Sequence, residues 1–414
     1  MRIQSYNYLV VLALLLLPLS GVAQEEKSKI QGELTFEKYL KEVGERNLSF
    51  LGERYELDIA QAGIVAARVF PDPELEFEGG EEYYSLELSY NLELGNKRGN
   101  RIRLAKREAE GVQLELEAFF QDLRSEAADA YLDAILQREL LSVKRNSYEK
   151  MIQLSMSDSL RFALGEITEN DARQSKLEAA TLLNEVYQQE AAYKSALALL
   201  NRYMGRGMSE LYTPKGSWSK LERAYQLADL IELAKEHRVE LKIAQHGTAV
   251  SAQLLKSIRA ERRLDLGLMV GYERDWHGLF PNRHTLKGGV TVPLKLSNTN
   301  RGSVRAGRFA LEQKRIEEQN RELELEVEVS KAYYLYESAQ RQVSQYRKGL
   351  LEESAKVLQG MVYRYKRGET SILEVLIAQR TNNEVQEQYL STLKEYGSAL
   401  IHLERTCGIW DISF

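Results

Sequence analysis

The sequence is almost without cysteine, since Cys407 is the one cysteine among 414 residues. A lone cysteine excludes a disulfide within the chain and the paired-cysteine motifs that bind zinc. The five histidines are scattered, and none lies in an HExxH motif or beside a nucleophile motif. An enzyme is the rival hypothesis; His277 and His284 share one predicted external loop and are candidates for weak metal binding, with hydrated loop histidines as the alternative. The sequence therefore predicts no catalytic, metal or cofactor site, and a protein that is not an enzyme.

Long apolar segments are also absent. The apolar run from Leu9 to Leu17 is too short to span a bilayer as a helix. It follows Arg2 and precedes small residues that end at Ala23, which is the pattern of a signal peptide over 1–23. We expect the mature chain to begin at Gln24, to be exported, and to enter a membrane only as strands.

Proline is scarce, and where it is missing the chain favours long helices. The segment from Leu294 to Phe414 has no proline, and Val112 to Leu164 has neither proline nor glycine. Because proline is costly inside helices, we expect one helix from about Asn100 to Ser157, on the order of 85 Å long. Its broad apolar band is typical of a helix with neighbours on both sides. An ordinary coiled coil is the alternative.

Strand-like alternation is confined to two short regions, about 74–94 and about 264–296, each holding two strands. Three of the four segments match the roughly 9–11 residues of a membrane-spanning strand, with apolar residues on one face. The alternative is a soluble antiparallel sheet with one solvated face. Since four strands cannot close a barrel and open edges are not viable in lipid, membrane strands would have to be pooled by several chains.

The chain repeats itself with a constant offset of 203 positions. The segments RFALGEIT and RYKRGETS match at this spacing, as do Tyr131 with Tyr334 and Gly205 with Gly408. Such a spacing indicates a duplication. We expect a first repeat over 24–204, a linker over 205–220 that contains Pro214, and a second repeat over 221–414. Each repeat would be a helix–strand–strand–helix–helix unit, with hairpin tips at about 161–171 and 364–374.

The motifs around the strands resemble a known family. FPDPELEFEGG joins a helix to a strand, and LELGNKRGNRIRLAKREAE and VPLKLSNTNRGSVRAGRFALE each lead from a strand into a helix. In this order they resemble the TolC family of outer-membrane efflux proteins, and most closely its CzcC/CusC-like heavy-metal branch. The resemblance implies a mainly α fold with a small membrane β part. It implies a homotrimer whose twelve-stranded β-barrel, in outer-membrane lipid, continues as a long periplasmic α-helical barrel.

The implied function is that of an exit duct. It would lie in the outer membrane of a Gram-negative bacterium and extend into the periplasm. It would passively conduct substrate, such as heavy-metal cations, from an inner-membrane pump of the resistance–nodulation–division type through a periplasmic adaptor. Drug efflux and type I protein secretion are alternatives within this class, and a soluble periplasmic coiled-coil adaptor is an alternative outside it.

The same resemblance assigns residues to the two hairpin tips. The expected adaptor contacts are Leu164, Gly165, Glu166, Thr168, Arg367, Gly368, Glu369 and Ser371. The expected aperture residues are Asp171 and Tyr365, in a lock between helices, and Glu374, in an acidic ring. Glycines that only reverse the chain, and an ordinary exposed carboxylate at Glu374, are the alternatives. The sequence departs from the family pattern at Thr370 and Ile377, so we expect a lock that is weaker or is formed by other residues.

A basic cluster follows the second strand, and we expect it near the periplasmic rim of the barrel. Gly95 and Gly99 are predicted to let the chain turn there. The cluster comprises Lys97, Arg98, Arg101, Arg103, Lys106 and Arg107. Contact with phosphate headgroups and pore charge are the predicted roles, and a solvated helix start is the alternative. Because the net charge is −5 and the clustering is local, we expect no nucleic-acid partner.

Overall fold

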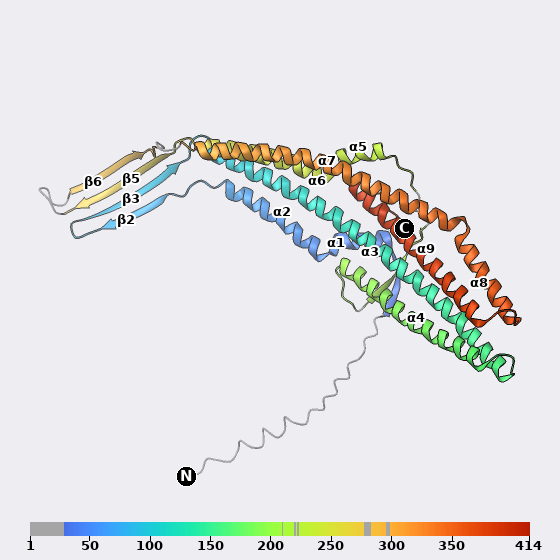
Figure 1. Cartoon of the computed structure of the whole chain (residues 1–414). Helices are drawn as coiled ribbons and strands as arrows, with labels where there is room; N and C mark the ends of the chain where they lie inside the picture. Colours follow the sequence, from blue (N-terminus) through green and yellow to red (C-terminus); the bar gives the residue numbers. More distant parts are fainter. Residues whose placement is uncertain (1–28, 209, 219–220, 222, 277–282, 295–298) are drawn as a thin grey trace, which may run out of the picture.

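The structure is a computed structural model that describes residues 29–208, 210–218, 221, 223–276, 283–294 and 299–414. The predicted signal peptide and His277 lie outside these residues. Figure 1 shows an elongated molecule with a sheet at one end and two helical hairpins at the other. Among the described residues, no helix combines the length and the apolar character needed to cross a bilayer.

The order of elements follows the predicted unit twice. The first part contains β1 (Lys29–Thr35), α1 (Phe36–Arg46), α2 (Leu48–Ala67), β2 (Glu74–Gly79), β3 (Tyr83–Leu92), α3 (Lys97–Ala163) and α4 (Glu169–Tyr203). The second part contains β4 (Glu210–Lys215), α5 (Leu227–His237), α6 (Val239–Ala260), β5 (Leu266–Asp275), β6 (Arg283–Thr291), α7 (Arg301–Gln345), the π-helical turn η2 (Tyr346–Leu350), α8 (Leu351–Lys366) and α9 (Ile372–Cys407).

The four predicted strands form one antiparallel sheet in the order β2-β3-β5-β6. Residues directly opposite one another share a face of the sheet. Leu88 lies opposite Leu75 on one side and opposite Val270 on the other, so these three side chains form part of one apolar face. That face is uncovered in the single chain, where Phe77 is 71% exposed. The last strand is shorter than predicted and ends at Thr291. Pro293 follows, and a proline has no N–H to donate to a strand ladder.

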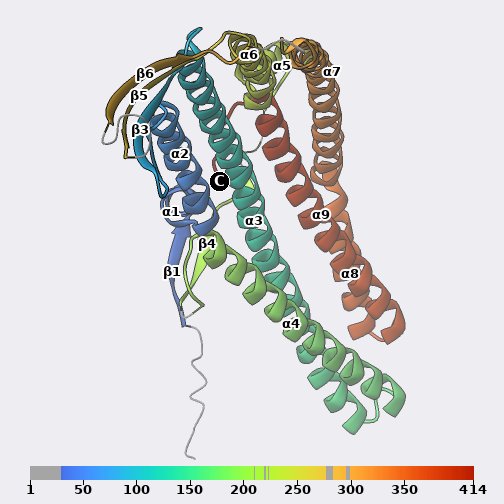
Figure 2. The same ribbon diagram turned by 90° about the vertical axis from the view of Figure 1, so that its left-hand side faces the viewer.

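Four long helices continue the sheet in the same lateral order. Helix α3 contacts α2 on one side and α6 on the other, and α6 contacts α7. The strip of helices α2-α3-α6-α7 thus matches the strip of strands β2-β3-β5-β6 (Figures 1 and 2). Helix α3 runs without a break for 67 residues, which confirms and extends the predicted long helix.

The segment 205–220, predicted as a linker or equatorial segment, contains a strand. Strand β4 pairs in parallel with β1 and includes Pro214, opposite Leu34. The hydroxyl oxygen of Tyr131 on α3 lies 2.6 Å from the carbonyl oxygen of Leu34 and 2.7 Å from that of Lys215, so its single hydrogen has an acceptor on both strands. This small sheet closes over the main core, where Tyr131 and Leu132 are fully buried. This strand was not predicted because a six-residue segment with a proline, close to glycines, has the composition of a turn.

The junction between sheet and helices differs from the prediction in two ways. Gly95, at φ +74°, and Asn96, at φ +59°, make the turn, whereas Gly99 lies inside α3. Lys97 is 5% exposed, and its ammonium lies 2.5 Å from the carboxylate of Asp265. A charge held in this way is not available for a lipid headgroup.

The arginines beside it are also engaged. Arg101 forms an ion pair with Glu93 at 2.9 Å. Arg98 lies over the ring of Phe70 and donates to the carbonyl of Arg68 at 2.7 Å. The basic cluster therefore also ties the start of α3 to residues next to α2, β3 and β5, and the prediction of a solvated or lipid-facing charge was wrong for the buried Lys97.

Candidate functional site at the hairpin ends

The two hairpin ends close with the same backbone geometry. Gly165 has φ +76° and Gly368 has φ +74°, in the left-handed region that favours glycine. The N–H of Gly165 donates to the carbonyl of Phe162, and the N–H of Gly368 donates to that of Tyr365, both at 2.9 Å. These bonds are typical of glycine-terminated helices. The turns predicted from the repeat are confirmed, and they lie at the far ends of α3/α4 and α8/α9 (Figure 2).

The side chains at the first tip are mostly exposed. Leu164 is 67% exposed, and Glu166 forms an ion pair with Arg161 at 3.3 Å. Thr168 caps α4, and Asp171 completes a capping box with it, since each side chain bonds the other residue's backbone N–H. The carboxylate of Asp171 is thus engaged within its own helix end.

The second tip uses the same positions differently. Arg367 forms an ion pair with Glu369 at 2.9 Å and donates to the hydroxyl of Tyr363 at 2.9 Å. Ser371 is the N-cap of α9 but makes no capping bond through its side chain. Glu374, the counterpart of Asp171, is exposed and accepts from the hydroxyl of Thr370. The acidic side chain predicted for an aperture is therefore at the surface of the single chain.

A buried contact joins the two hairpins just above their tips. The hydroxyl of Tyr365 on α8 donates to Oδ1 of Asp158 on α3 at 3.0 Å. Tyr365 is 4% exposed and Asp158 is fully buried. We call this pair the latch, because it links a helix of the first repeat to a helix of the second.

The environment of the latch changes the ionisation of both groups. Burial raises the pKa of Asp158 above its ordinary value, although hydrogen bonds from Ser175 and Tyr365 act in the opposite direction. Burial also raises the pKa of Tyr365, and the charge of Asp158 adds to this effect. Asp171 raises the pKa of both groups through its charge, so this predicted aperture residue lies near the latch without bonding to it.

Packing around the latch is apolar. A cluster of buried side chains from α3, α4, α8 and α9 surrounds Tyr365 and includes Met151, Ala179, Leu182, Ile372, Val375 and Leu376. Tyr365 was predicted as a lock residue, but its partner Asp158 was missed. Comparison of the two halves does not point to Asp158, because the residue 203 positions later is Met361 and not a carboxylate. The one available signal was a carboxylate in line with Met151 and Ser155 on the buried stripe of α3.

Comparisons with known proteins agree with this architecture. A family model described as outer membrane efflux protein matches residues 230–408. The cobalt-zinc-cadmium resistance protein CzcC of Cupriavidus metallidurans is 23% identical over 383 residues, which cover 91% of this chain and 90% of CzcC.

Solved structures match over nearly the same length. A crystal structure of CusC has a TM-score of 0.74 at 16% identity and covers 90% of this chain and 92% of its own. The open state of the MtrE outer membrane channel of Neisseria gonorrhoeae has a TM-score of 0.70 at 16% identity, covering 90% and 88%. The resemblance predicted from the strand and helix motifs is confirmed. Residues 230–408 thus match the outer membrane efflux protein family model, and over nearly its whole length the chain is similar to CzcC in sequence and to CusC and MtrE in fold.

Proposed function

We propose that this protein is the exit duct of a tripartite efflux system in the outer membrane of a Gram-negative bacterium. Three copies would form one channel that passively conducts metal cations from an inner-membrane pump, of the resistance–nodulation–division type, through a periplasmic adaptor. The observation that carries the proposal is the matched lateral order of strands and helices, with an uncovered apolar face on the strands.

The sheet supports assembly because its two outer strands lack a second neighbour. Strand β2 pairs only with β3, and β6 pairs only with β5, among the described residues. Unpaired strand edges are not tolerated in lipid. If β6 of one copy pairs with β2 of the next, three copies of four strands close a twelve-stranded barrel with the apolar face outward.

The outer helices of the strip support the same assembly. Large apolar side chains are exposed on α2, namely Tyr55, Ile59 and Val65, and on α7, namely Phe309, Ile316 and Leu323. Exposed apolar surface on this scale indicates a protein partner. In the proposed ring, α2 of one copy lies beside α7 of the next, as β2 lies beside β6.

The polar face of the sheet supports a cationic cargo. It carries Glu74, Glu76 and Glu87, and Glu76 lies directly opposite Glu87. None of the three carboxylates forms an ion pair with a described residue. Like charges directly opposite one another destabilise a sheet. A role of these carboxylates in attracting cations to the channel would explain why they are placed there. The name of the relative CzcC points in the same direction. Drug efflux and protein secretion remain the alternative cargoes.

The hairpin ends are the proposed gate and adaptor surface. We propose that the latch holds the resting state, and that Asp171 and Glu374 line the aperture below it. The exposed tip residues would meet the adaptor, whose docking would separate the hairpins and break the latch. The gate proposal is supported by the burial of Tyr365 and Asp158 between elements of different repeats.

Two measurements test the proposal. Native mass spectrometry of the detergent-solubilised protein is expected to give the mass of three copies, and planar bilayers are expected to show a cation-preferring conductance. A particle with the mass of one copy, or recovery in the soluble periplasmic fraction, would remove the duct and favour the soluble adaptor. For cargo, Glu76→Gln/Glu87→Gln is expected to reduce cation preference, whereas Lys356→Gln on α8, paired with Glu352 at 2.7 Å, is the control.

A further inference from the structure

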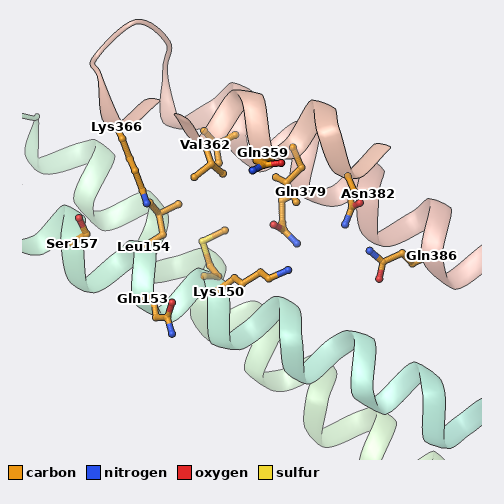
Figure 3. A pocket seen from close by; sticks show the side chains of 14 residues that line it. Lys150, Gln153, Leu154, Ser157, Gln359, Val362, Lys366, Gln379, Asn382 and Gln386 are labelled. Atoms are coloured by element: carbon orange, nitrogen blue, oxygen red, sulfur yellow. The ribbon is translucent and has the colours of Figure 1, made fainter. Parts of the chain in front are cut away.

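A cleft of about 500 Å³ lies between the two hairpins, beside the latch. Its walls come from α3 on one side and from α8 and α9 on the other (Figure 3). Pockets of roughly 300–1,000 Å³ with an apolar lining and a few polar groups are the usual size and character of ligand sites.

The apolar part of the cleft is continuous with the buried cluster around Tyr365. Met151 and Leu154 of α3 face Leu358 and Val362 of α8, with Val375 of α9 behind them. This surface is chemically suited to an alkyl chain. It is formed jointly by both repeats, so any occupant would contact both hairpins at once.

Two ammonium groups enter the cleft. Figure 3 shows Lys366 reaching from the end of α8 toward Leu154 and Ser157, and Lys150 extending from α3 along the gap toward Gln379. Within the part of the chain that the structure describes, neither lysine forms an ion pair. By contrast, Lys144, which precedes Lys150 on α3, is paired: its ammonium lies 2.9 Å from the carboxylate of Glu185 and 2.5 Å from that of Glu387.

Amides complete the polar part of the lining. The side chains of Gln153, Gln359, Gln379, Asn382 and Gln386 surround the cleft and supply N–H donors. No carboxylate is among the lining residues. The cleft thus combines an apolar floor, two cationic groups and neutral hydrogen-bond donors, which is complementary to an anionic head on an alkyl chain.

We propose that this cleft binds a small amphipathic anion, a medium-chain alkyl carboxylate, with its head at the ammonium of Lys150 beside Gln379 and its chain running over Met151, Val362 and Leu154 toward Lys366. Because the walls belong to both repeats, the bound anion bridges the hairpins and favours the arrangement in which the latch is formed. The binding site stands on the cleft alone, whereas its effect on the channel rests on the proposed duct function.

Binding is tested by isothermal titration calorimetry of the full-length protein held in a neutral amphiphilic polymer, with decanoate below its micelle concentration. Lys150→Gln/Lys366→Gln is expected to weaken binding about tenfold or more, because charge-assisted hydrogen bonds are lost. Leu154→Trp, which fills the cleft, is expected to abolish it. The matched control is Lys356→Gln on the same helix α8, outside the cleft, which is expected to bind like the unchanged protein.

Three results would overturn the site: no binding of decanoate, equal binding by Lys150→Gln/Lys366→Gln, or equal binding of the neutral decyl maltoside. Conductance in planar bilayers then tests the effect on the channel. Decanoate is expected to lower the open probability at least twofold in the unchanged protein and not in the double variant. Unaltered open probability with intact binding would refute the bridging effect, whereas a protein that never conducts would instead refute the duct.

Discussion

The two hairpins match each other in sequence at an offset of 203 positions, yet they differ in how they are built. In the first, α3 runs to the tip as one unbroken helix. The second is interrupted at η2, where Gly349 adopts φ +128°. Their turns are nearly identical in backbone geometry. The residue three positions before the turn glycine differs, since Tyr365 in the second hairpin is buried and Phe162 in the first is 43% exposed. The two turns are therefore alike, whereas the contacts beside them differ.

The difference teaches which hairpin depends on its neighbour. The second hairpin inserts Tyr365 into a cluster shared with α3 and α4, whereas the first hairpin offers Phe162 to the solvent. An interrupted helix with one buried anchor is suited to move as a unit when the anchor is released. We therefore expect substitutions at equivalent positions to have unequal effects.

The largest inequality is expected at the aromatic pair. Tyr365→Ala removes a buried aromatic side chain and is expected to cost about 3–5 kcal/mol of unfolding free energy. Phe162→Ala, at the equivalent position, is expected to cost less than about 1 kcal/mol, because Phe162 is 43% exposed and Tyr365 only 4%. Denaturant unfolding followed by circular dichroism measures both. Equal losses would show that the hairpins are anchored alike.

The helix interruption should give the next effect. Gly349→Ala places a side chain at a φ that L-residues rarely adopt and is expected to cost about 1–3 kcal/mol. Asn146→Ala, 203 positions earlier in the unbroken α3, is expected to be neutral or slightly stabilising because alanine is the better helix former. Thermal unfolding of the two variants makes the comparison. A harmless Gly349→Ala would mean that η2 straightens without cost.

A smaller contrast is expected at the helix caps. Thr168→Ala removes one half of a capping box and is expected to cost about 1 kcal/mol. Ser371→Ala is expected to cost only a few tenths of a kcal/mol, since the Ser371 side chain makes no capping bond. Hydrogen exchange at the first turns of α4 and α9 locates the effect. Faster exchange confined to α9 would reverse the assignment.

The smallest expected effect is the pH dependence of the latch. Because burial raises the pKa of Asp158 in the folded chain, its stabilising contribution is present below the ordinary pKa of an aspartate and is lost as the pH rises through the raised value. Asp158→Asn keeps a side chain of similar shape without this titration. As the pH rises through the acidic range, the melting temperature of the unchanged protein is expected to decrease more steeply than that of Asp158→Asn. Parallel curves would exclude Asp158 as the cause.

The sequence predicted those features that depend on local chemistry. Alternation along 85–94 marked a strand, the lack of proline marked α3, and glycines at a fixed offset marked both turns. Features that depend on distant contacts were not predicted. Strand β4 exists because β1 pairs with it, and Asp158 matters because Tyr365 reaches it from another repeat. The aperture roles of Asp171 and Glu374 and the adaptor contacts at the tips stay predictions.

The identical lateral order of strands and helices has a geometric consequence. If three copies close into a ring, six hairpins surround the axis. Hairpins with an unbroken α3 then alternate with hairpins that are interrupted at η2. A partner assembled from identical subunits would then meet two inequivalent docking positions on every copy. With this asymmetry, one kind of hairpin could stay in place while the other moves during opening.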